Sequence, residues 1–494
     1  MLGRVAERIL SMVVLFLLVR LLSPTDFGLM AMAGSLIAII QSLTAFGFDW
    51  ALVRHPDPTR QHFDTAWTMQ LMLAIASCLA LICLAHPMAA FYREPKLVAV
   101  ICALAAIHLL WGFENSGVAY LRRQMQFDRE FILVTVPRLA SMLVTIPLAY
   151  LLRSYWALII GLLASRLTSL VASYLIHPFR PRLSLSKWRE LISFSGWLQM
   201  LNILESIRLR LPDLALGRMH GAHSVAVYSI ASELASLAVT EIAAPINRVM
   251  FSKYSAIQGD IRQLAQAYLS VAAVLWLITI PVAVGMALVS RSLVIALLGP
   301  AWAEAMPVIQ LLSVAMLGHI MTANTHNIFM AKGSPEINTK LLLLFVIVQT
   351  LLIFLLVPGR GAVGAAAAHA IAVWLLLPPR VLLLQRMIGV GIFDVLVLAW
   401  RPIAAACVMA GVVGWAHPLE APVTTYAALV ELVSLSALGA VTFSATVALL
   451  WFLSGMRAGS ETQLIGLLRP TLDKLGAIMR STRLWAWTRR SAVG

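Results

Sequence analysis

Charge is scarce in this sequence: 12% of its 494 residues are Asp, Glu, Lys or Arg, and only 22 are acidic. Cysteine is scarcer still. Cys78, Cys83, Cys102 and Cys407 all lie in apolar stretches and lack the spacing of a metal site, which favours packing roles. The chain also lacks the GxxxxGK[ST] phosphate loop, His-Glu-x-x-His and Gly-x-Ser-x-Gly, so nothing indicates direct ATP use or these hydrolase chemistries. We therefore expect no cofactor and no metal.

Apolar residues dominate the composition. They make up 61% of the chain, and the mean hydropathy is +0.88, far outside the range of soluble domains. A helix needs about 20 residues to cross the hydrocarbon of a bilayer. We predict an all-α integral membrane protein with about 14 transmembrane helices, with twelve spans plus two interfacial pieces (362–379 and 402–416) left open. The predicted spans are residues 5–22, 28–53, 66–91, 97–121, 132–152, 155–177, 191–215, 224–250, 266–289, 304–330, 339–357, 362–379, 402–416 and 425–454.

Basic residues collect in every second gap between these spans. With both termini in the cytoplasm, 25 of the 37 Lys and Arg residues lie inside and 7 outside, and the other five lie within spans. Cytoplasmic loops of membrane proteins carry such an excess, so we predict an N-in/C-in membrane protein. The net charge of +15 follows from this bias and does not indicate nucleic-acid binding.

The sequence also contains a weak internal repeat, in which its first half resembles its second. When residues 5–55 are moved forward by 198 positions, Glu7 falls on Glu205 and Arg20 on Arg218. This pattern predicts two pseudo-symmetric six-helix bundles, 1–185 and 186–390, followed by two additional spans in 391–455 and a tail, 456–494. Such bundles place their site between the halves and rock against each other. The tail has apolar residues at helical spacing among arginines, which favours a basic amphipathic helix on the inner leaflet over a docking helix for assembly enzymes.

Three segments resemble a known family. Arg20-Leu-Leu-Ser-Pro-Thr-Asp-Phe-Gly28 resembles the opening signature of polysaccharide (Wzx-like) flippases of the multidrug/oligosaccharidyl-lipid/polysaccharide exporter superfamily. Leu121–Phe127 is similar to the basic loop after their fourth span, and Pro245–Phe251 to the end of their eighth. The resemblance implies transport of an undecaprenyl-diphosphate-linked oligosaccharide from the cytoplasmic to the periplasmic leaflet. It further implies partners among membrane lipids, the polysaccharide polymerase and glycosyltransferases.

Five arginines lie within the predicted spans, where a charge costs several kcal/mol and usually faces a cavity or a partner. The planar guanidinium suits phosphate, so these residues are our candidates for the diphosphate and sugar site. Two of them belong to i,i+3 pairs on one helix, Glu205/Arg208 and Arg210/Asp213. Such pairs either hold a cation site ready or only neutralise themselves for insertion. The candidates are Arg138, Arg166, Arg208, Arg210 and Arg248.

Glu233 and Glu241 are the candidates for ion coupling, because neither has a basic residue three or four positions away. Carboxylates in membrane surroundings can bind a proton or Na⁺, and hydrogen bonding to a neighbouring helix is the alternative explanation for both residues. Two other functions stay open. One is a multidrug-type cation antiporter of the same superfamily, which would favour an acidic or aromatic pocket. The other is a membrane polymerase or ligase for lipid-linked sugars, which would need a long periplasmic loop.

Overall fold

In the computed structural model, the regular structure of the described residues is helical. Backbone N–H and C=O groups find no water in hydrocarbon, so apolar stretches adopt the helix, which pairs these groups internally. The predicted all-α class is therefore confirmed for this part of the chain. The described residues are 2–44, 52, 55, 57–124, 126–192, 196–322, 324–417 and 424–455.

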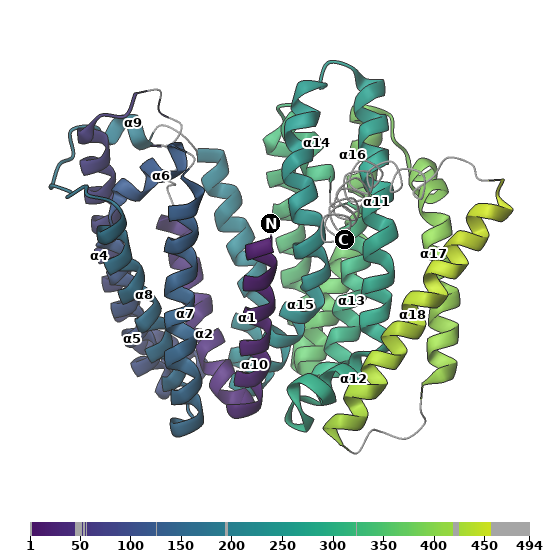
Figure 1. The fold of residues 1–494 in the computed structure, drawn as a ribbon, viewed down its shortest axis with the longest axis horizontal. Coiled ribbons are helices and arrows are strands. Elements are labelled where there is room, and N and C mark those ends of the chain that lie inside the picture. Colours follow the sequence, from purple (N-terminus) through teal and green to yellow (C-terminus); the bar gives the residue numbers. More distant parts are fainter. Residues whose placement is uncertain are drawn as a thin grey trace, which may run out of the picture.

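The helices fall on two sides of one long element, α10 (Figure 1). The first side contains α1 (Leu2–Leu21), α2 (Pro24–Thr44), α4 (Arg60–Tyr92), α5 (Lys96–Gly112), α6 (Ala119–Arg123), α7 (Phe127–Leu152), α8 (Trp156–Ile176) and α9 (Trp188–Ile192). After α10 (Gly196–Ala256), the second contains α11 (Ile261–Leu288), α12 (Ser290–Leu293), η2 (Val294–Leu298), η3 (Pro300–Trp302), α13 (Ala305–Met321), α14 (Thr325–Ala331), α15 (Pro335–Leu375), α16 (Leu377–Ile388), α17 (Ile392–Ala416) and α18 (Thr425–Leu453).

Nine helical stretches of the described residues are long and apolar enough to cross a membrane, and the chain is a multi-pass membrane protein. One of them, Glu336–Ile388, carries two predicted spans, 339–357 and 362–379. The helices α1 and α5 are shorter, and α10 holds two further predicted spans. The predicted spans coincide largely with helix in their described parts, but 97–121 is interrupted between α5 and α6, and 304–330 between α13 and α14. The count of fourteen crossings and the N-in/C-in orientation stay predictions.

Two glycines bend the longest helices. Gly221 in α10 has φ 79° and ψ −174°, and Gly361 in α15 has φ 53° and ψ −132°. Glycine adopts positive φ at little cost, so a helix ends and a new one begins without a loop. We call residues 196–220 the first arm of α10 and residues 222–256 its second arm. The first arm lies along α2: Ser206 Oγ donates to the carbonyl of Ala38 and Gln199 Nε2 to that of Ser42.

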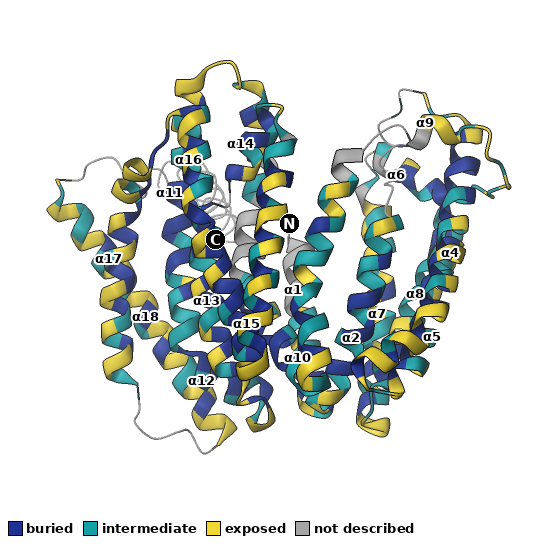
Figure 2. Cartoon of the chain, turned by 180° about the vertical axis from the view of Figure 1, so that it is seen from behind, coloured by how far each residue is buried: buried dark blue, intermediate teal, exposed yellow. Residues whose placement is uncertain are grey.

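One buried apolar cluster joins the two sides at the lower end of Figure 1, which we call the closed end. It includes Tyr92 of α4, Leu216 of α10 and Trp302 of η3. The approach is closest where α2 meets α10, since a Cβ added to Gly28 would lie 1.8 Å from the carbonyl oxygen of Ala222. Figure 2 shows buried residues gathered where the sides meet, whereas toward the other end the two sets of helices diverge.

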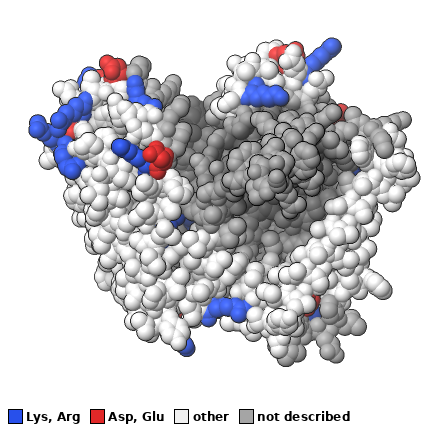
Figure 3. Space-filling model, viewed as in Figure 1, with Lys and Arg blue, Asp and Glu red and all other residues white. Residues whose placement is uncertain are grey.

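Most of the Lys and Arg side chains visible in Figure 3 lie at the upper end of the molecule. This end holds α9 and the connection from α10 to α11, which the charge pattern assigns to the cytoplasm. Two of the basic gaps, those that hold α9 and the α10–α11 connection, therefore lie at one end of the molecule. The proposed division into bundles at 1–185, 186–390 and 391–455 stays a prediction, and the tail, 456–494, lies outside the described residues.

Candidate functional site

Arg208 and Glu205 form a close ion pair on the first arm of α10. Arg208 donates from Nε to Oε2 of Glu205 at 2.9 Å and from Nη2 to Oε1 at 2.5 Å. The i,i+3 spacing places both side chains on one face of the helix. The guanidinium also lies 5.7 Å from the ring centroid of Phe345 on α15, a cation–π distance. Arg208 is therefore fixed from two directions.

Arg210 and Asp213 form the second predicted pair, with 3.7 Å between Nη1 and Oδ2. Asp213 is buried and accepts hydrogen bonds from Ser35 Oγ of α2 at 3.0 Å and Ser229 Oγ at 3.1 Å. Ser229 belongs to the second arm of α10, so one carboxylate links α2 with both arms. Arg210 keeps 40% of its side chain exposed and can still contact a ligand.

A polar cavity of about 360 Å³ opens beside Glu205, between the first arm of α10 and helices α14, α15 and α16. Its polar lining residues are Asn202, Glu205, Thr322, Thr325, His326, Asn338 and Arg380. Arg380 Nη1 donates to Thr322 Oγ1 at 3.3 Å. The cavity thus offers a guanidinium, amides, hydroxyls and an imidazole around one carboxylate, a set that can bind both anionic and hydroxyl-rich groups.

None of the four described arginine candidates lines this cavity; Arg208 adjoins it through its ion pair with the lining residue Glu205. Arg166 of α8 lies 3.8 Å from Glu114 Oε1, measured from its Nη1, and keeps 37% of its side chain exposed. Arg138 is exposed on α7 behind the buried Pro137. Both belong to helices on the first side of the molecule, so the structure separates them from the Arg208 pair.

The two ion-coupling candidates and Arg248 lie on the second arm of α10. Glu233 is exposed there. The side chains of Glu241 and Arg248 lie outside the described residues. The assignment of Glu233 and Glu241 to coupling stays a prediction.

Sequence reasoning missed Arg380, His326 and Asn338. The charge pattern places Arg380 in a cytoplasmic gap, because it follows Pro378 and Pro379 at the end of a predicted span. In the structure it lies within α16, and its side chain reaches the cavity. Only the packing of α14 and α15 against α10, with α16 directly after α15, reveals this, although an arginine so close to an apolar stretch was a usable signal.

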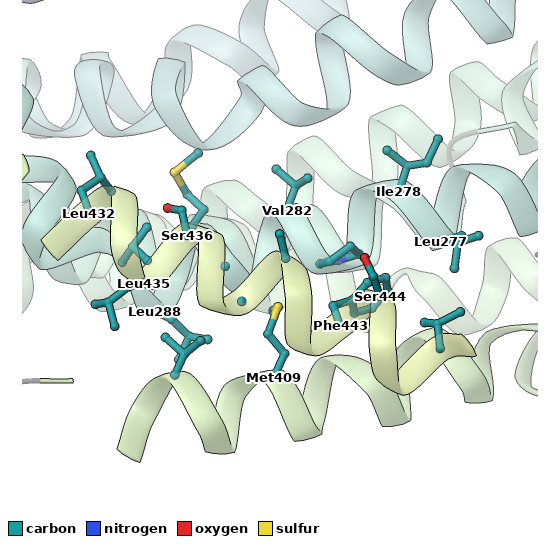
Figure 4. A pocket seen from close by; sticks show the side chains of 18 of the residues that line it. Leu277, Ile278, Val282, Leu288, Met409, Leu432, Leu435, Ser436, Phe443 and Ser444 are labelled. Carbon is teal, nitrogen blue, oxygen red and sulfur yellow. The ribbon is translucent and has the colours of Figure 1, made fainter. Parts of the chain in front are cut away.

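A second, larger cavity of about 810 Å³ is almost wholly apolar and lies between α11, α17 and α18 (Figure 4). Figure 4 shows Ile278 and Val282 of α11, Met409 of α17 and Phe443 of α18 around it. The spans of 391–455 therefore pack against α11 so as to leave a space suited to hydrocarbon.

Comparison with known proteins identifies the family. A family model described as "Polysaccharide biosynthesis protein" matches residues 17–307, more than half of the chain. The chain belongs to this family. This match agrees with the resemblance of its opening signature to a polysaccharide exporter family.

Two relatives share a quarter of their aligned residues with the chain. "Lipopolysaccharide biosynthesis protein WzxC" of Escherichia coli (strain K12) is 25% identical over 370 residues, 74% of each chain. "Succinoglycan biosynthesis transport protein ExoT" of Rhizobium meliloti (strain 1021) is 25% identical over 311 residues, 62% of each.

Solved structures share the fold at low sequence identity. "Lipid II flippase MurJ, inward closed conformation" has a TM-score of 0.74 and 11% identity, covering 91% of this chain and 98% of that one. An inward-facing multidrug resistance MATE family transporter has a TM-score of 0.60 and 15% identity, covering 76% and 93%. The chain therefore has the fold of these transporters.

Proposed function

We propose that this protein is a flippase for an undecaprenyl-diphosphate-linked oligosaccharide repeat unit. It moves this unit from the cytoplasmic to the periplasmic leaflet of the bacterial inner membrane, for exopolysaccharide, O-antigen or capsule biosynthesis. The family and the printed names of its relatives support this role. The observation that carries it is the Arg208–Glu205 pair beside a polar cavity, because guanidinium at membrane depth otherwise costs stability.

A diphosphate needs fixed cations on its path, since an unpaired charge is expensive to remove from water. Glu205 holds Arg208 in place before the substrate arrives, and an anionic oxygen entering the cavity competes with Glu205 for the same donors. Arg380 supplies a second cation across the cavity. Arg210, Arg166, Arg138 and Arg248 are then further contacts for diphosphate and acidic sugars.

The polyprenyl tail has the opposite requirement, because each buried methylene favours an apolar surrounding by about 0.8 kcal/mol. The apolar cavity between α11, α17 and α18 suits such a chain (Figure 4). Headgroup and tail thus have separate places in the second half of the molecule, one polar and one apolar.

Transport follows alternating access. The closed end keeps the two sides together at the periplasmic face, and rocking of the bundles opens it while the cytoplasmic end closes. Glu233 and Glu241 couple this motion to a proton or Na⁺ gradient. The polymerase and glycosyltransferases of the pathway act on the same lipid and are the expected protein partners.

The two alternatives fit the described residues less well. A multidrug-type cation antiporter shares the fold, but the cavity places Arg380 beside Glu205, with Arg208 bound to that carboxylate, so its charge favours anions. A polymerase or ligase needs room for chemistry at the periplasmic end. The described connections there are short: α1 and α2, and α7 and α8, follow one another within a few residues.

The test measures lipid movement by the protein in liposomes loaded with a fluorescent undecaprenyl-diphosphate disaccharide. Wild-type protein exchanges the probe between leaflets, and Arg208→Ala slows exchange at least about tenfold, which corresponds to about 1.4 kcal/mol. Arg262→Ala, which removes an exposed arginine of α11, is the matched control and leaves the rate unchanged. Wild-type liposomes that exchange no more probe than empty ones contradict the proposal.

A further inference from the structure

We infer that His319 and His369 form a binding site for a single proton, and that its occupancy is coupled through Arg208 to the polar cavity. The pair joins α13 to the part of α15 that follows Gly361, with 3.2 Å between the two Nε2 atoms and 5.3 Å between ring centroids. The inference rests on the proposed flippase function, because the anionic headgroup to which it couples a proton is the substrate of that function.

The distance between the rings fixes how hydrogen is shared. Two bare nitrogens at 3.2 Å would repel, and so would two N–H groups, so one ring donates its Nε2–H to the bare Nε2 of the other. An extra proton then binds the bare Nδ1 of the donating ring, and the single shared hydrogen can shift between the two Nε2 atoms, so neither ring has to leave its place. Titratable groups at membrane depth are rare and commonly belong to proton pathways.

Gln349 can hydrogen-bond to His369 both before and after the pair takes up the extra proton. Its carboxamide lies 3.3 Å from His369 Nδ1, and its side chain is fully buried. An amide offers two donors on nitrogen and an acceptor on oxygen. The Nε2 amide group of Gln349 can donate to His369 Nδ1 when that nitrogen carries no hydrogen. When Nδ1 is protonated, a rotated amide can accept its hydrogen through Oε1 of Gln349. A buried apolar residue here would allow neither bond.

Two cations and one carboxylate face the pair among the described residues. Arg208 lies over the Phe345 ring, whose centroid is 6.4 Å from that of His319 and 5.7 Å from that of His369. Arg380 approaches from α16 through Thr322, whose hydroxyl also bonds the carbonyl of His319. Glu205 on α10 offsets the charge of Arg208.

These charges set the direction of coupling. While Arg208 and Arg380 carry no anionic ligand, their positive charge opposes a proton on the pair. An anion that binds both guanidiniums removes this opposition, so proton uptake and headgroup binding favour each other. The two sites need no direct contact, because Phe345 is the spacer between them.

A route for the proton follows from the same geometry. His369 is 7% exposed, whereas His319 is only partly buried. His319 lies one turn before Thr322, a lining residue of the cavity. A proton that reaches the cavity therefore meets His319 first and His369 second.

The experiment uses full-length protein in liposomes that contain a trapped pH indicator and the same fluorescent lipid probe. Wild-type protein should move protons together with the lipid. His369→Gln and His319→Asn should reduce lipid-dependent proton movement at least about tenfold, within the usual range of coupling between sites. Both variants should keep downhill lipid exchange without a gradient. His223→Gln is the matched control, since His223 is partly exposed and pairs with Glu304 at 3.3 Å.

The outcomes separate the inference from the function. Lipid exchange without proton movement in the wild type, or wild-type proton movement in both histidine variants, overturns the inference and leaves the flippase intact. A wild type that moves no lipid removes both. If a histidine variant is not inserted at the wild-type level, Gln349→Met decides in its place: reduced proton movement with retained lipid exchange supports the inference, and unchanged proton movement overturns it.

Discussion

Asp213 illustrates how a buried carboxylate organises its surroundings. Its oxygens accept from Ser35 on α2 and Ser229 on the second arm of α10, and Arg210 lies 3.7 Å away. A buried polar group that loses its partner costs about 1–3 kcal/mol. Asp213→Leu would leave both hydroxyls without this acceptor.

We therefore expect Asp213→Leu to destabilise the protein by about 1–3 kcal/mol, with Arg210 adding little because it is partly solvated. Unfolding monitored by thiol labelling of buried Cys78 in denaturant measures the change. Asp57→Leu, at an exposed position, is the control. Equal stability of the two variants would contradict the role given to Asp213.

Glu190, outside the spanning helices, fastens the segment between α8 and α10 to the start of α4. It accepts from Lys187 Nζ at 2.7 Å and from His62 Nε2 at 2.9 Å, and His55 Nε2 lies 3.8 Å away. The three groups His55, His62 and Glu190 lie close enough to hold a metal ion. The hydrogen bonds from Lys187 and His62 lower the pKa of Glu190 to about 2.

A carboxyl group whose pKa is lowered in the folded protein stabilises the fold at pH values above its ordinary pKa of 4.5. This contribution is lost as the pH falls toward the folded-state pKa of about 2. Glu190→Gln should therefore lower the melting temperature at pH 7, and the difference from wild type should shrink between pH 4.5 and pH 2. Thermal unfolding across this range in detergent measures it. A difference that does not depend on pH would show that the carboxylate charge is not the cause.

At the scale of elements, the close packing of α2 against α10 depends on a glycine, which has no side chain. A Cβ at Gly28 would meet the Ala222 backbone at 1.8 Å, while a Cβ at Gly34 on the same helix would meet nothing within 4 Å. Backbone cannot yield as a flexible side chain can, so the helices must separate. The two glycines form a matched pair for experiment.

Gly28→Ala should lower both thermal stability and lipid exchange, because it opens the closed end. Gly34→Ala should leave exchange unchanged and stabilise the helix by up to about 1 kcal/mol. Melting temperatures and exchange rates of the two variants, compared side by side, check this. A Gly28→Ala protein that behaves like Gly34→Ala would refute the close approach.

At the scale of the whole molecule, a few contacts connect the two sides at the closed end. Arg20 at the end of α1 donates to the carbonyls of Leu297 at 3.1 Å and Ala296 in η2. Trp302 Nε1 donates to the carbonyl of Val19 at 3.3 Å, and its ring meets Phe27 edge to face at 5.8 Å. The proposed alternating access requires that these bonds break on each cycle.

Arg20→Ala should therefore expose the closed end more often. In a variant whose four cysteines are replaced by Ser, Leu298→Cys reports this, since Leu298 is 2% exposed. Its labelling by a membrane-impermeant maleimide should accelerate several-fold with Arg20→Ala. Arg153→Ala, at the turn between α7 and α8, is the control. Unchanged labelling would exclude Arg20 as a contact that holds the sides together.

The sequence by itself determined the helices, their membrane character, the family and the two ion pairs on α10. Apolar runs and i,i+3 spacing are local properties, and a helix in lipid satisfies its own backbone wherever it packs. Arg208 and Glu205 could thus be paired from their spacing alone. The predicted bundle boundaries and ion-coupling residues remain without such a local signature.

Only the tertiary structure decided which distant residues meet. Ser35 and Asp213 lie 178 positions apart, and His319 and His369 lie 50 apart. Arg380 reaches the cavity because α16 packs against α11, α15 and α17, an arrangement that its own neighbours in the chain do not encode. Contacts between helices depend on crossing geometry and on small residues such as Gly28, and one sequence specifies these only through the whole packed bundle.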